Sequence, residues 1–240
     1  MIEASNIFIQ QGNFELNDLS FTIDTGQYAC LIGQTGTGKT TILEAICGLK
    51  PLQKGKFILD GKDISTLKPA ERKVGFVPQD GALFETMTVA ENIAFALKIR
   101  KWSKADRQKR AQELADLLSI SHLLDRMPTH LSGGEKQRVA LGRALSFYPS
   151  VICLDEPMSA LDDKTKMNLY NLIGNIRKEL TITALHITHN IEEVEYLADK
   201  VLHLQNGHLK SYTKEAFLEK KDELIFSSEQ NSSNGMISEA

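Results

Sequence analysis

The chain has 240 residues, of which 42% are hydrophobic, so it is long enough to bury the core of one full domain. Its formal net charge of −3 does not indicate a strongly basic nucleic-acid binder, and it has no continuous apolar run near the ~20 residues that span a bilayer. Three cysteines without paired spacing lie in apolar patterns, which favours core packing in a reducing compartment over disulfides or metal binding.

The first part of the chain predicts strands, a loop and a helix. Residues 2–24 alternate as two antiparallel strands, with a turn near 11–13. The apolar run 28–32 between two glycines indicates a buried strand, and residues 41–47 have helical spacing that stops at Gly48. Between this strand and this helix lies GQTGTGKT at 33–40, which fits the phosphate-binding pattern G-x-x-x-x-G-K-[ST].

This loop has the chemistry that a nucleotide phosphate requires. Glycines let successive backbone N–H groups point inward at an anion, and the helix N-terminus adds partial positive charge. Lys39 can reach the β- and γ-phosphates, and the Thr40 hydroxyl can ligate Mg²⁺. The alternative is a glycine-rich turn that binds nothing, which the order of strand, loop and helix disfavours. The candidate nucleotide-binding residues are Gly33, Gln34, Thr35, Gly36, Thr37, Gly38, Lys39, Thr40 and Thr41.

The middle of the chain is predicted to be helical. Short strands are expected at 56–60 and 74–78, and a capping box of Thr88 and Glu91 then opens a helix, followed by a second helix capped by Ser103. Strand signals are missing from there to about residue 149, so we expect an inserted α-helical subdomain at about 86–149. Seven basic residues surround Trp102, for which a solvated helix face is favoured over contact with anionic lipid headgroups: Lys98, Arg100, Lys101, Lys104, Arg107, Lys109 and Arg110.

Strands and helices alternate again after residue 150. The remaining predicted elements are strands at 151–155 and 182–188, a helix at 163–180, a helix capped by Asn190, a hairpin at 200–212 and an amphipathic helix at 213–226. This alternation predicts an α/β fold with a mostly parallel sheet, preceded by an antiparallel β subdomain. We expect one domain over 1–226 and a disordered polar tail over 227–240.

A second candidate anion site lies in LSGGEKQR at 131–138. Ser132, Gly133 and Gly134 stand where a helix is expected to begin, at about Glu135, so a hydroxyl and exposed N–H groups meet at a helix N-terminus. Two phosphate-binding helix ends in one chain suggest that two copies face each other head to tail. Each nucleotide would then lie between the phosphate loop of one copy and the Ser132 loop of the other.

The stretch LSGGEKQR resembles the signature motif of ATP-binding cassette (ABC) transporter ATPases, and the resemblance extends over about 2–212. Further motifs stand in the order typical of that family: the phosphate loop, Gln79, the acidic pair Asp155 and Glu156 at a strand end, SALD at 159–162, and His189. The resemblance implies a P-loop NTPase core that uses ATP and Mg²⁺.

The resemblance also implies a role for each position. Thr40, Gln79 and Asp155 would hold Mg²⁺, with Asp155 acting through water. The expected catalytic residues are Glu156, which would orient or deprotonate the attacking water, His189, which would bond the γ-phosphate, and Gln79, which would sense it. The other expected nucleotide contacts are Ser132, Gly133, Gly134, Gln137 and Asp162, the last across the dimer interface.

The sequence departs from the family pattern in two places. The family usually stacks adenine on an aromatic residue shortly before the turn at Gly12, where this chain has Gln10 and Gln11; Phe8 and Phe14 are the candidate replacements. In addition, Gly142 interrupts the helix after the signature motif, at a cost of about 1 kcal/mol relative to alanine. The sequence alone offers no reason for this glycine.

Four stretches resemble importer ATPases: 12–16, 76–84, 89–93 and 122–126. The resemblance is closest to the molybdate/tungstate group, although sulfate, iron and polyamine importers are similar. We therefore expect the ATP-hydrolysing subunit of an importer, cytoplasmic and peripheral on the inner face of the cell membrane. The start of the sequence at Met1 and the lack of a predicted membrane segment also favour this expectation. The implied partners are an integral-membrane permease and an extracytoplasmic solute-binding protein, without nucleic acid. We expect a groove at 81–97 to receive the permease.

Two alternatives lie in other functional classes. Soluble ABC-type ATPases that act on nucleic acid or ribosomes usually carry long coiled coils between the phosphate loop and the acidic strand, or two cassettes in one chain. This sequence has neither feature. A binding module without catalysis is disfavoured because all five residues implied in turnover are present: Lys39, Gln79, Asp155, Glu156 and His189.

Overall fold

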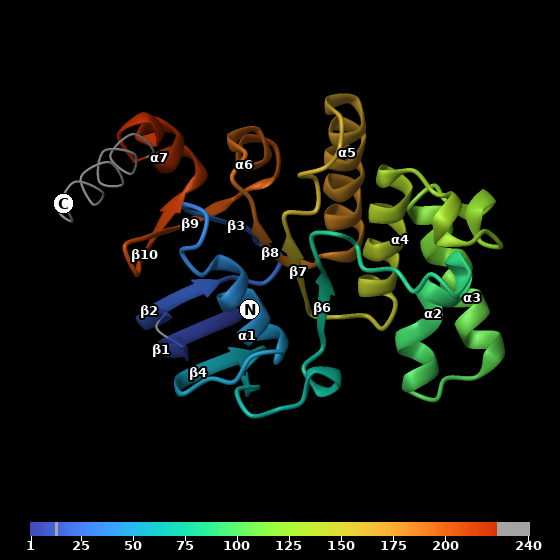
Figure 1. Ribbon diagram of the computed structural model, residues 1–240, viewed down its shortest axis with the longest axis horizontal. Coiled ribbons are helices and arrows are strands. Elements are labelled where there is room, and N and C mark those ends of the chain that lie inside the picture. Colours follow the sequence, from blue (N-terminus) through green and yellow to red (C-terminus); the bar gives the residue numbers. More distant parts are fainter. Residues whose placement is uncertain (13, 225–240) are drawn as a thin grey trace, which may run out of the picture.

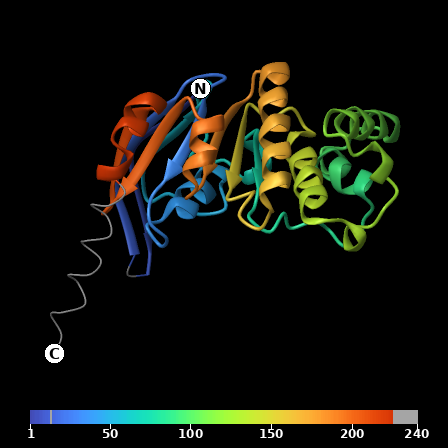
Figure 2. The same ribbon diagram turned by 90° about the horizontal axis from the view of Figure 1, so that it is seen from above.

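The computed structural model describes residues 1–12 and 14–224, which form an elongated molecule (Figure 1). A four-stranded antiparallel sheet lies at one end, a six-stranded sheet lies in the middle, and a group of helices lies at the other end. Seen from above, the same order holds, with α2 to α4 farthest from the N-terminal strands (Figure 2). This arrangement confirms the predicted α/β fold with an antiparallel N-terminal part and a helical insertion.

The antiparallel sheet has the strand order β2-β1-β4-β5. Its strands are β1 (Ile2–Gln11), β2 (Phe14–Ile23), β4 (Lys54–Leu59) and β5 (Lys62–Asp63). Along β1 the residues Ile2, Ala4, Ile7 and Ile9 are buried, while most of their neighbours are more exposed. One face of the sheet therefore packs on the core, as the alternating sequence predicts.

The central sheet has the order β10-β9-β3-β8-β7-β6, and all neighbours except β9 and β10 are parallel. Its strands are β3 (Tyr28–Ile32), β6 (Val74–Val77), β7 (Val151–Asp155), β8 (Thr183–Ile187), β9 (Lys200–Gln205) and β10 (His208–Thr213). Every residue of β3, β7 and β8 is buried, because helices or the other sheet cover both faces. Burial on both faces explains why these segments are mostly apolar rather than alternating, with Asp155 at the end of β7 and Thr183 and His186 in β8 as buried polar exceptions.

Helices cover the central sheet from both sides. Helix α1 (Lys39–Cys47) packs in the hydrophobic cluster shared by the two sheets. Helices α4 (Gly133–Leu145), α5 (Asp163–Leu180) and α6 (Ile191–Leu197) contribute to the cluster on the opposite face. Because these strands run parallel, their carboxyl ends meet at one edge of the sheet, which is where α/β proteins bind ligands.

The helical group also contains α2 (Val89–Ile99), α3 (Lys104–Leu117) and the short 3-10 helices Ser121–Leu123 and Pro128–His130. The predicted capping box of Thr88 and Glu91 opens α2, and Ser103 caps α3. The structure supplies the missing reason for Gly142. A Cβ there would lie 2.9 Å from Leu118 Cδ1 and 3.3 Å from Ile93 Cγ1, so glycine permits close packing of α4 on its neighbours.

Helix α4 begins at Gly133, two residues before the predicted start at about Glu135, because Ser132 is the N-cap. In the predicted helix at 213–226, α7 (Lys214–Glu219) is followed by a turn at Lys220, and residues 221–224 are again helical. The predicted tail at 227–240, the end of this predicted helix at 225–226, and residue 13 lie outside the described residues.

Candidate nucleotide site

The phosphate loop connects β3 to α1, and its glycines have backbone conformations that other residues rarely adopt. The φ angles of Gly36 and Gly38 are +82° and +98°. A Cβ at Gly33 would lie 2.3 Å from the carbonyl oxygen of Leu204, so only glycine fits there. Gly38 is the N-cap of α1, and among the described residues no side chain caps this helix and no acidic residue stands in its first turn. The backbone N–H groups at this helix end are therefore available to an anion.

Lys39 lies inside the loop rather than in open solvent, and its side chain is 7% exposed. Its Nζ donates hydrogen bonds of 2.8 Å to the carbonyl oxygens of Gly33 and Gln34. Burial lowers the pKa of Lys39, while Glu156 and Asp155 oppose that shift. The cation is thus held at the centre of the loop by neutral acceptors, which leaves it able to bind phosphate.

A pair of oxygen ligands lies beside the loop. Asp155 ends β7, and the Thr40 hydroxyl donates a hydrogen bond of 3.3 Å to its Oδ1 atom. Burial raises the pKa of Asp155, an effect that a nearby cation would reverse. A hydroxyl and a carboxylate are hard oxygen ligands of the kind that Mg²⁺ takes, together with phosphate oxygens and water. The residues therefore fit the predicted magnesium ion.

Glu156 and His189 meet across the carboxyl ends of β7 and β8. The Nδ1 atom of His189 lies 3.3 Å from Oε2 of Glu156. Glu156 has a φ of +43°, a left-handed conformation that costs about 1–3 kcal/mol in a residue other than glycine. Its backbone N–H donates to the carbonyl oxygen of Ile187, which anchors this strained residue to β8. Glu156 lines the same cleft as the residues of the phosphate loop.

Lys39, Thr40, Glu156 and His189 line one cleft of about 760 Å³. Its lining comes from distant parts of the chain: Gln11, Phe14, Thr35, Gly36, Gly38 to Thr41, Gln79, Glu156 and His189. Most of the predicted phosphate-loop residues and all three predicted catalytic residues are therefore brought together. Gly33, Gln34 and Thr37 border a neighbouring cavity on the other side of the loop, which also reaches Thr35 and His189.

The structure distinguishes the two candidate aromatic residues. The ring of Phe14 lies so close to Gly38 that a Cβ on that glycine would be 2.5 Å from Phe14 Cζ. Phe8 does not line the cleft, and Lys54 Nζ lies 5.5 Å from the centre of its ring. Phe14 is thus the aromatic residue that can contact a base bound beside the phosphate loop.

The predicted second anion site lies away from this cleft. Ser132, Gly133 and Gly134 begin α4, and a Cβ on Gly134 would lie 2.5 Å from the Thr165 side chain at the start of α5. Asp162 caps α5 by accepting hydrogen bonds from the Thr165 backbone N–H and hydroxyl, at 3.0 and 2.6 Å. These residues form a surface of their own, and one chain does not bring them to its own phosphate loop.

The loop after Gln79 is held by three polar side chains, of which only Gln137 was selected from the sequence, and for another role. Arg143 of α4 donates to the carbonyl oxygens of Gly81 and Ala82, at 2.9 and 2.7 Å. Gln137, predicted to contact the nucleotide, is buried and donates to the Gln79 carbonyl oxygen at 3.2 Å. A further clamp comes from the fully buried Asn92, whose side chain bonds both the N–H and the carbonyl of Phe84. The only sequence signal was a polar residue on the apolar face of each helix.

A phosphate loop that opens a helix, carboxylates at the end of a parallel strand and a histidine at the end of the next define a P-loop nucleotide-binding domain. The chain belongs to the ABC transporter family, whose sequence model matches residues 16–159. In the described part of the chain, no helix combines the length and apolar content needed to cross a bilayer.

Relatives of known assignment are similar over most of this chain. The molybdate/tungstate import ATP-binding protein WtpC of Thermococcus kodakarensis is 45% identical over 82% of this chain and 59% of its own length. WtpC of Archaeoglobus fulgidus is 44% identical over 89% of this chain and 88% of its own length. The sulfate/thiosulfate import ATP-binding protein CysA of Synechococcus elongatus is 39% identical over 86% of this chain and 60% of its own length. The chain thus spans about 60% of the length of the first curated relatives that it matches.

A solved structure has the same fold. The dimeric structure of the ATP-binding cassette MJ0796 in a post-hydrolysis state bound to ADP and Pi matches with a TM-score of 0.78 and 28% identity. The match covers 89% of this chain and 99% of that chain. The fold of an ATP-binding cassette therefore extends over nearly all of the described residues.

Proposed function

We propose that this chain binds and hydrolyses ATP as the nucleotide-binding subunit of an ABC importer. The observation that carries the proposal is the single cleft in which Lys39, Glu156 and His189 converge on an uncapped helix N-terminus. Phosphoryl transfer depends mainly on positioning and charge stabilisation, and this cleft offers donors, a cation and a carboxylate in one place.

Each residue has a task that follows from its place. Lys39 and the N–H groups of α1 would hold the β- and γ-phosphates, while Thr40, Asp155 and Gln79 would hold Mg²⁺, which supplies positive charge to the phosphates. Glu156 would accept a proton from the attacking water or orient it. His189, whose side chain is 66% exposed, would reach a γ-phosphate from the side of Glu156.

The second nucleotide contact would come from another copy of the chain. Ser132, Gly133, Gly134 and Asp162 lie outside the cleft of their own chain, so a head-to-tail dimer is the arrangement that lets them reach a nucleotide. The dimeric form of the MJ0796 structure supports this proposal. ATP would join the two copies, and hydrolysis would release them.

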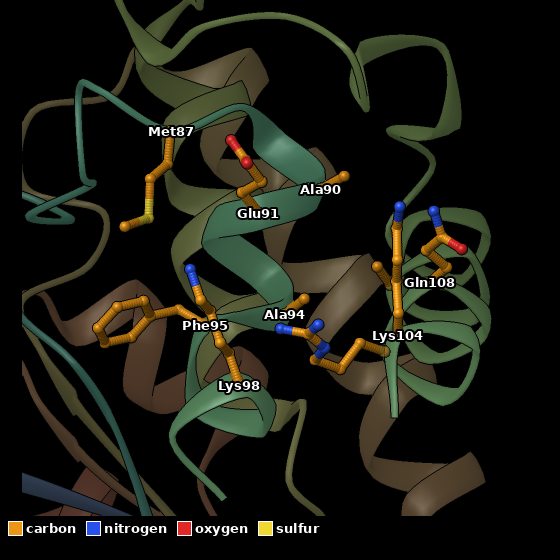
Figure 3. Close-up of a pocket in the computed structure, with 10 residues that line it drawn as sticks. Met87, Ala90, Glu91, Ala94, Phe95, Lys98, Lys104 and Gln108 are labelled. Carbon is orange, nitrogen blue, oxygen red and sulfur yellow. The ribbon is translucent and has the colours of Figure 1, made fainter. Parts of the chain in front are cut away.

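The proposed transport partner is an integral-membrane permease that docks between α2 and α3. Figure 3 shows a pocket of about 330 Å³ there, with Met87, Ala90, Ala94 and Phe95 on α2 or just before it. The predicted groove at 81–97 thus covers one wall of the pocket, and α3 provides the other. Three cations border the apolar floor of the pocket: Lys98, Lys104 and Arg107. A docking segment with an apolar side chain and a carboxylate would therefore fit.

The proposed solute is a tetrahedral oxyanion such as molybdate or tungstate. The support comes from relatives named as molybdate/tungstate import proteins at 41–45% identity, with sulfate/thiosulfate import proteins close behind. The solute would meet an extracytoplasmic binding protein and the permease, not this chain. The chain itself would lie on the cytoplasmic face of the membrane, held there by the permease.

Glu156→Gln tests the proposed chemistry. The substitution keeps size and hydrogen bonding but removes the basic carboxylate, so ATP hydrolysis should fall on the order of 10²-fold or more while ATP binding persists. Release of phosphate measures turnover, and equilibrium binding of ATP with Mg²⁺ measures occupancy. Glu179→Gln, a change at an exposed position on α5, is the control and should leave both unchanged. Normal turnover by the Glu156→Gln protein would contradict the assigned role.

A further inference from the structure

Three buried polar side chains form a chain of contacts behind the nucleotide cleft, without lining it. Tyr28, His186 and Glu193 are 1%, 0% and 3% exposed. The hydroxyl of Tyr28 lies 2.9 Å from Nδ1 of His186, and Nε2 of His186 lies 3.1 Å from Oε2 of Glu193. Burying polar side chains costs free energy unless each has a partner, and apolar residues of similar size would fill the same space without that cost. Stability alone therefore does not explain these residues.

The three side chains come from the elements that carry the two halves of the cleft. Tyr28 is in β3, which leads into the phosphate loop, and His186 is in β8, three residues before His189. Glu193 is in α6, which begins just after His189. The chain of contacts thus joins the strand of the phosphate loop to both sides of the turn that carries His189.

Glu193 also contacts the residue directly before His189. Burial raises the pKa of Glu193, but the nearby His186 and Thr188 side chains outweigh it and hold that pKa below its usual value. The Thr188 hydroxyl in turn accepts a hydrogen bond of 3.0 Å from the Asn190 backbone N–H. Thr188 is 2% exposed, and its own N–H donates to the Leu31 carbonyl oxygen. Every residue next to His189 is therefore fixed, while the His189 ring itself extends toward solvent.

We infer that Glu193 and His186, supported by Tyr28, are positioning residues that hold the turn at 188–190 so that the His189 ring meets Glu156. Without them the turn would keep its backbone contact to β3 but lose the side-chain contacts that fix its direction. The inference rests on the proposed ATP hydrolysis, because positioning His189 matters only if that ring takes part in turnover.

A double-mutant cycle separates positioning from general stability. Glu193→Leu should lower kcat roughly 10-fold through misplacement of His189, with little change in the KM for ATP. In a His189→Ala background, the same substitution should cause no further loss, since the ring that it misplaces is gone. Glu193→Gln keeps the hydrogen bonds and should recover most of the parent kcat. Glu192→Leu, at the exposed neighbouring position on α6, is the matched control and should leave kcat unchanged.

A second measurement is independent of turnover. The ring resonances of His189 in the nucleotide-free protein should shift in Glu193→Leu, because the ring leaves Glu156, and should remain in place in Glu192→Leu. An equal loss of kcat in both backgrounds, or unmoved His189 resonances, would overturn the inference. If the parent protein does not hydrolyse ATP but the resonances shift as expected, the proposed function fails while the positioning contact stands. Thermal melting identifies any variant that does not fold. If Glu193→Leu does not fold, Tyr28→Phe, which removes the hydroxyl that lies 2.9 Å from Nδ1 of His186, carries the resonance measurement, and unmoved His189 resonances in that variant would overturn the inference.

Discussion

The starts of α1 and α4 look alike in sequence but differ in structure. Both carry glycines at or beside their N-terminus, and both were predicted to bind phosphate. Helix α1 has Gly38 as its N-cap, without a side-chain cap and without an acidic residue in its first turn. Helix α4 has Ser132 as its N-cap, and the Glu135 carboxylate of its first turn accepts hydrogen bonds from the Ser132 N–H and hydroxyl, at 2.7 and 2.8 Å.

The difference lies in what already satisfies each helix end. At α1, the free N–H groups and the buried Lys39 await an anion. At α4, Glu135 supplies negative charge of the kind that a phosphate would supply, and hydrogen bonds from Ser132 lower the pKa of this carboxyl, which keeps it ionised. The phosphate loop can thus bind a nucleotide without losing an existing hydrogen bond. The α4 end, in contrast, must give up or share a hydrogen bond between Ser132 and Glu135 to do so. Binding should therefore occur first at α1 and then at α4 of the facing copy.

Lys39→Ala should have the largest effect, because it removes the cation from the end that binds first. ATP binding should weaken strongly and turnover should be lost, while the fold persists, since Lys39 bonds the loop carbonyl oxygens of Gly33 and Gln34, two residues at the surface beside a neighbouring cavity. Isothermal titration with ATP and Mg²⁺, together with thermal melting, measures both. Lys164→Ala, at an exposed position on α5, is the control. If Lys39→Ala hydrolyses ATP like the parent, the site is not the phosphate loop.

Ser132→Arg should abolish phosphate binding at the N-terminus of α4 and leave ATP binding at the N-terminus of α1 intact. In a Glu156→Gln background, ATP with Mg²⁺ should produce a dimer, and Ser132→Arg should prevent it by placing bulk and charge where the phosphate of the facing copy would lie. ATP binding by the monomer should survive, because Ser132 does not line the cleft of its own chain. Sizing chromatography measures the dimer, and Thr66→Arg, at an exposed position after β5, is the control. Dimers that persist in Ser132→Arg would contradict the shared site.

The sequence predicted best what depends on local chemistry. The bounds of β3 and α5 agree with the predicted ranges, and the phosphate loop was found because its glycines and Lys39 must stand at fixed spacing. Features that depend on distant packing escaped prediction. Gly142 is explained only by the approach of Leu118 and Ile93, which no spacing in sequence reveals.

Strand pairing decided a further feature that the sequence left open. β1 and β2 pair with register shifts between Ala4 and Ile7 and again between Ile7 and Ile9. Such irregularities change which face a side chain occupies, so counting residues could not show whether Phe8 or Phe14 faces the cleft. The self-capping of α4 by Glu135 was likewise missed, although a serine followed three residues later by glutamate is the pattern of a capping box.

Phe14→Leu should weaken nucleotide binding by about tenfold, a smaller loss than those above, because stacking of a base on an aromatic ring contributes roughly 1–3 kcal/mol. The effect would show that the α1 end holds the base as well as the phosphates. Binding of ATP and GTP should fall alike, since both bases present an aromatic face. Phe8→Leu is the matched control and should change neither affinity, given its place outside the cleft. A selective loss of ATP binding would mean that Phe14 recognises adenine specifically.

Glu135→Gln should have the smallest effect and the opposite sign. Glutamine can keep the hydrogen bonds to Ser132 but removes the charge that opposes a phosphate, so the ATP-dependent dimer of Glu156→Gln should tighten by a few-fold. Glu91→Gln is the matched control, because Glu91 completes the same capping box at α2, and it should leave the dimer unchanged. The pKa of Glu135 lies below its usual value, so its charge persists at neutral pH and is lost only as the pH falls through that lowered pKa. The difference between Glu135→Gln and its parent should therefore be full at neutral pH and vanish in acid. Dimer dissociation constants from analytical ultracentrifugation at two pH values measure it. A weaker dimer in Glu135→Gln would mean that the carboxylate supports the shared site, and the contrast between the two helix ends would then lie in their geometry rather than in their charge.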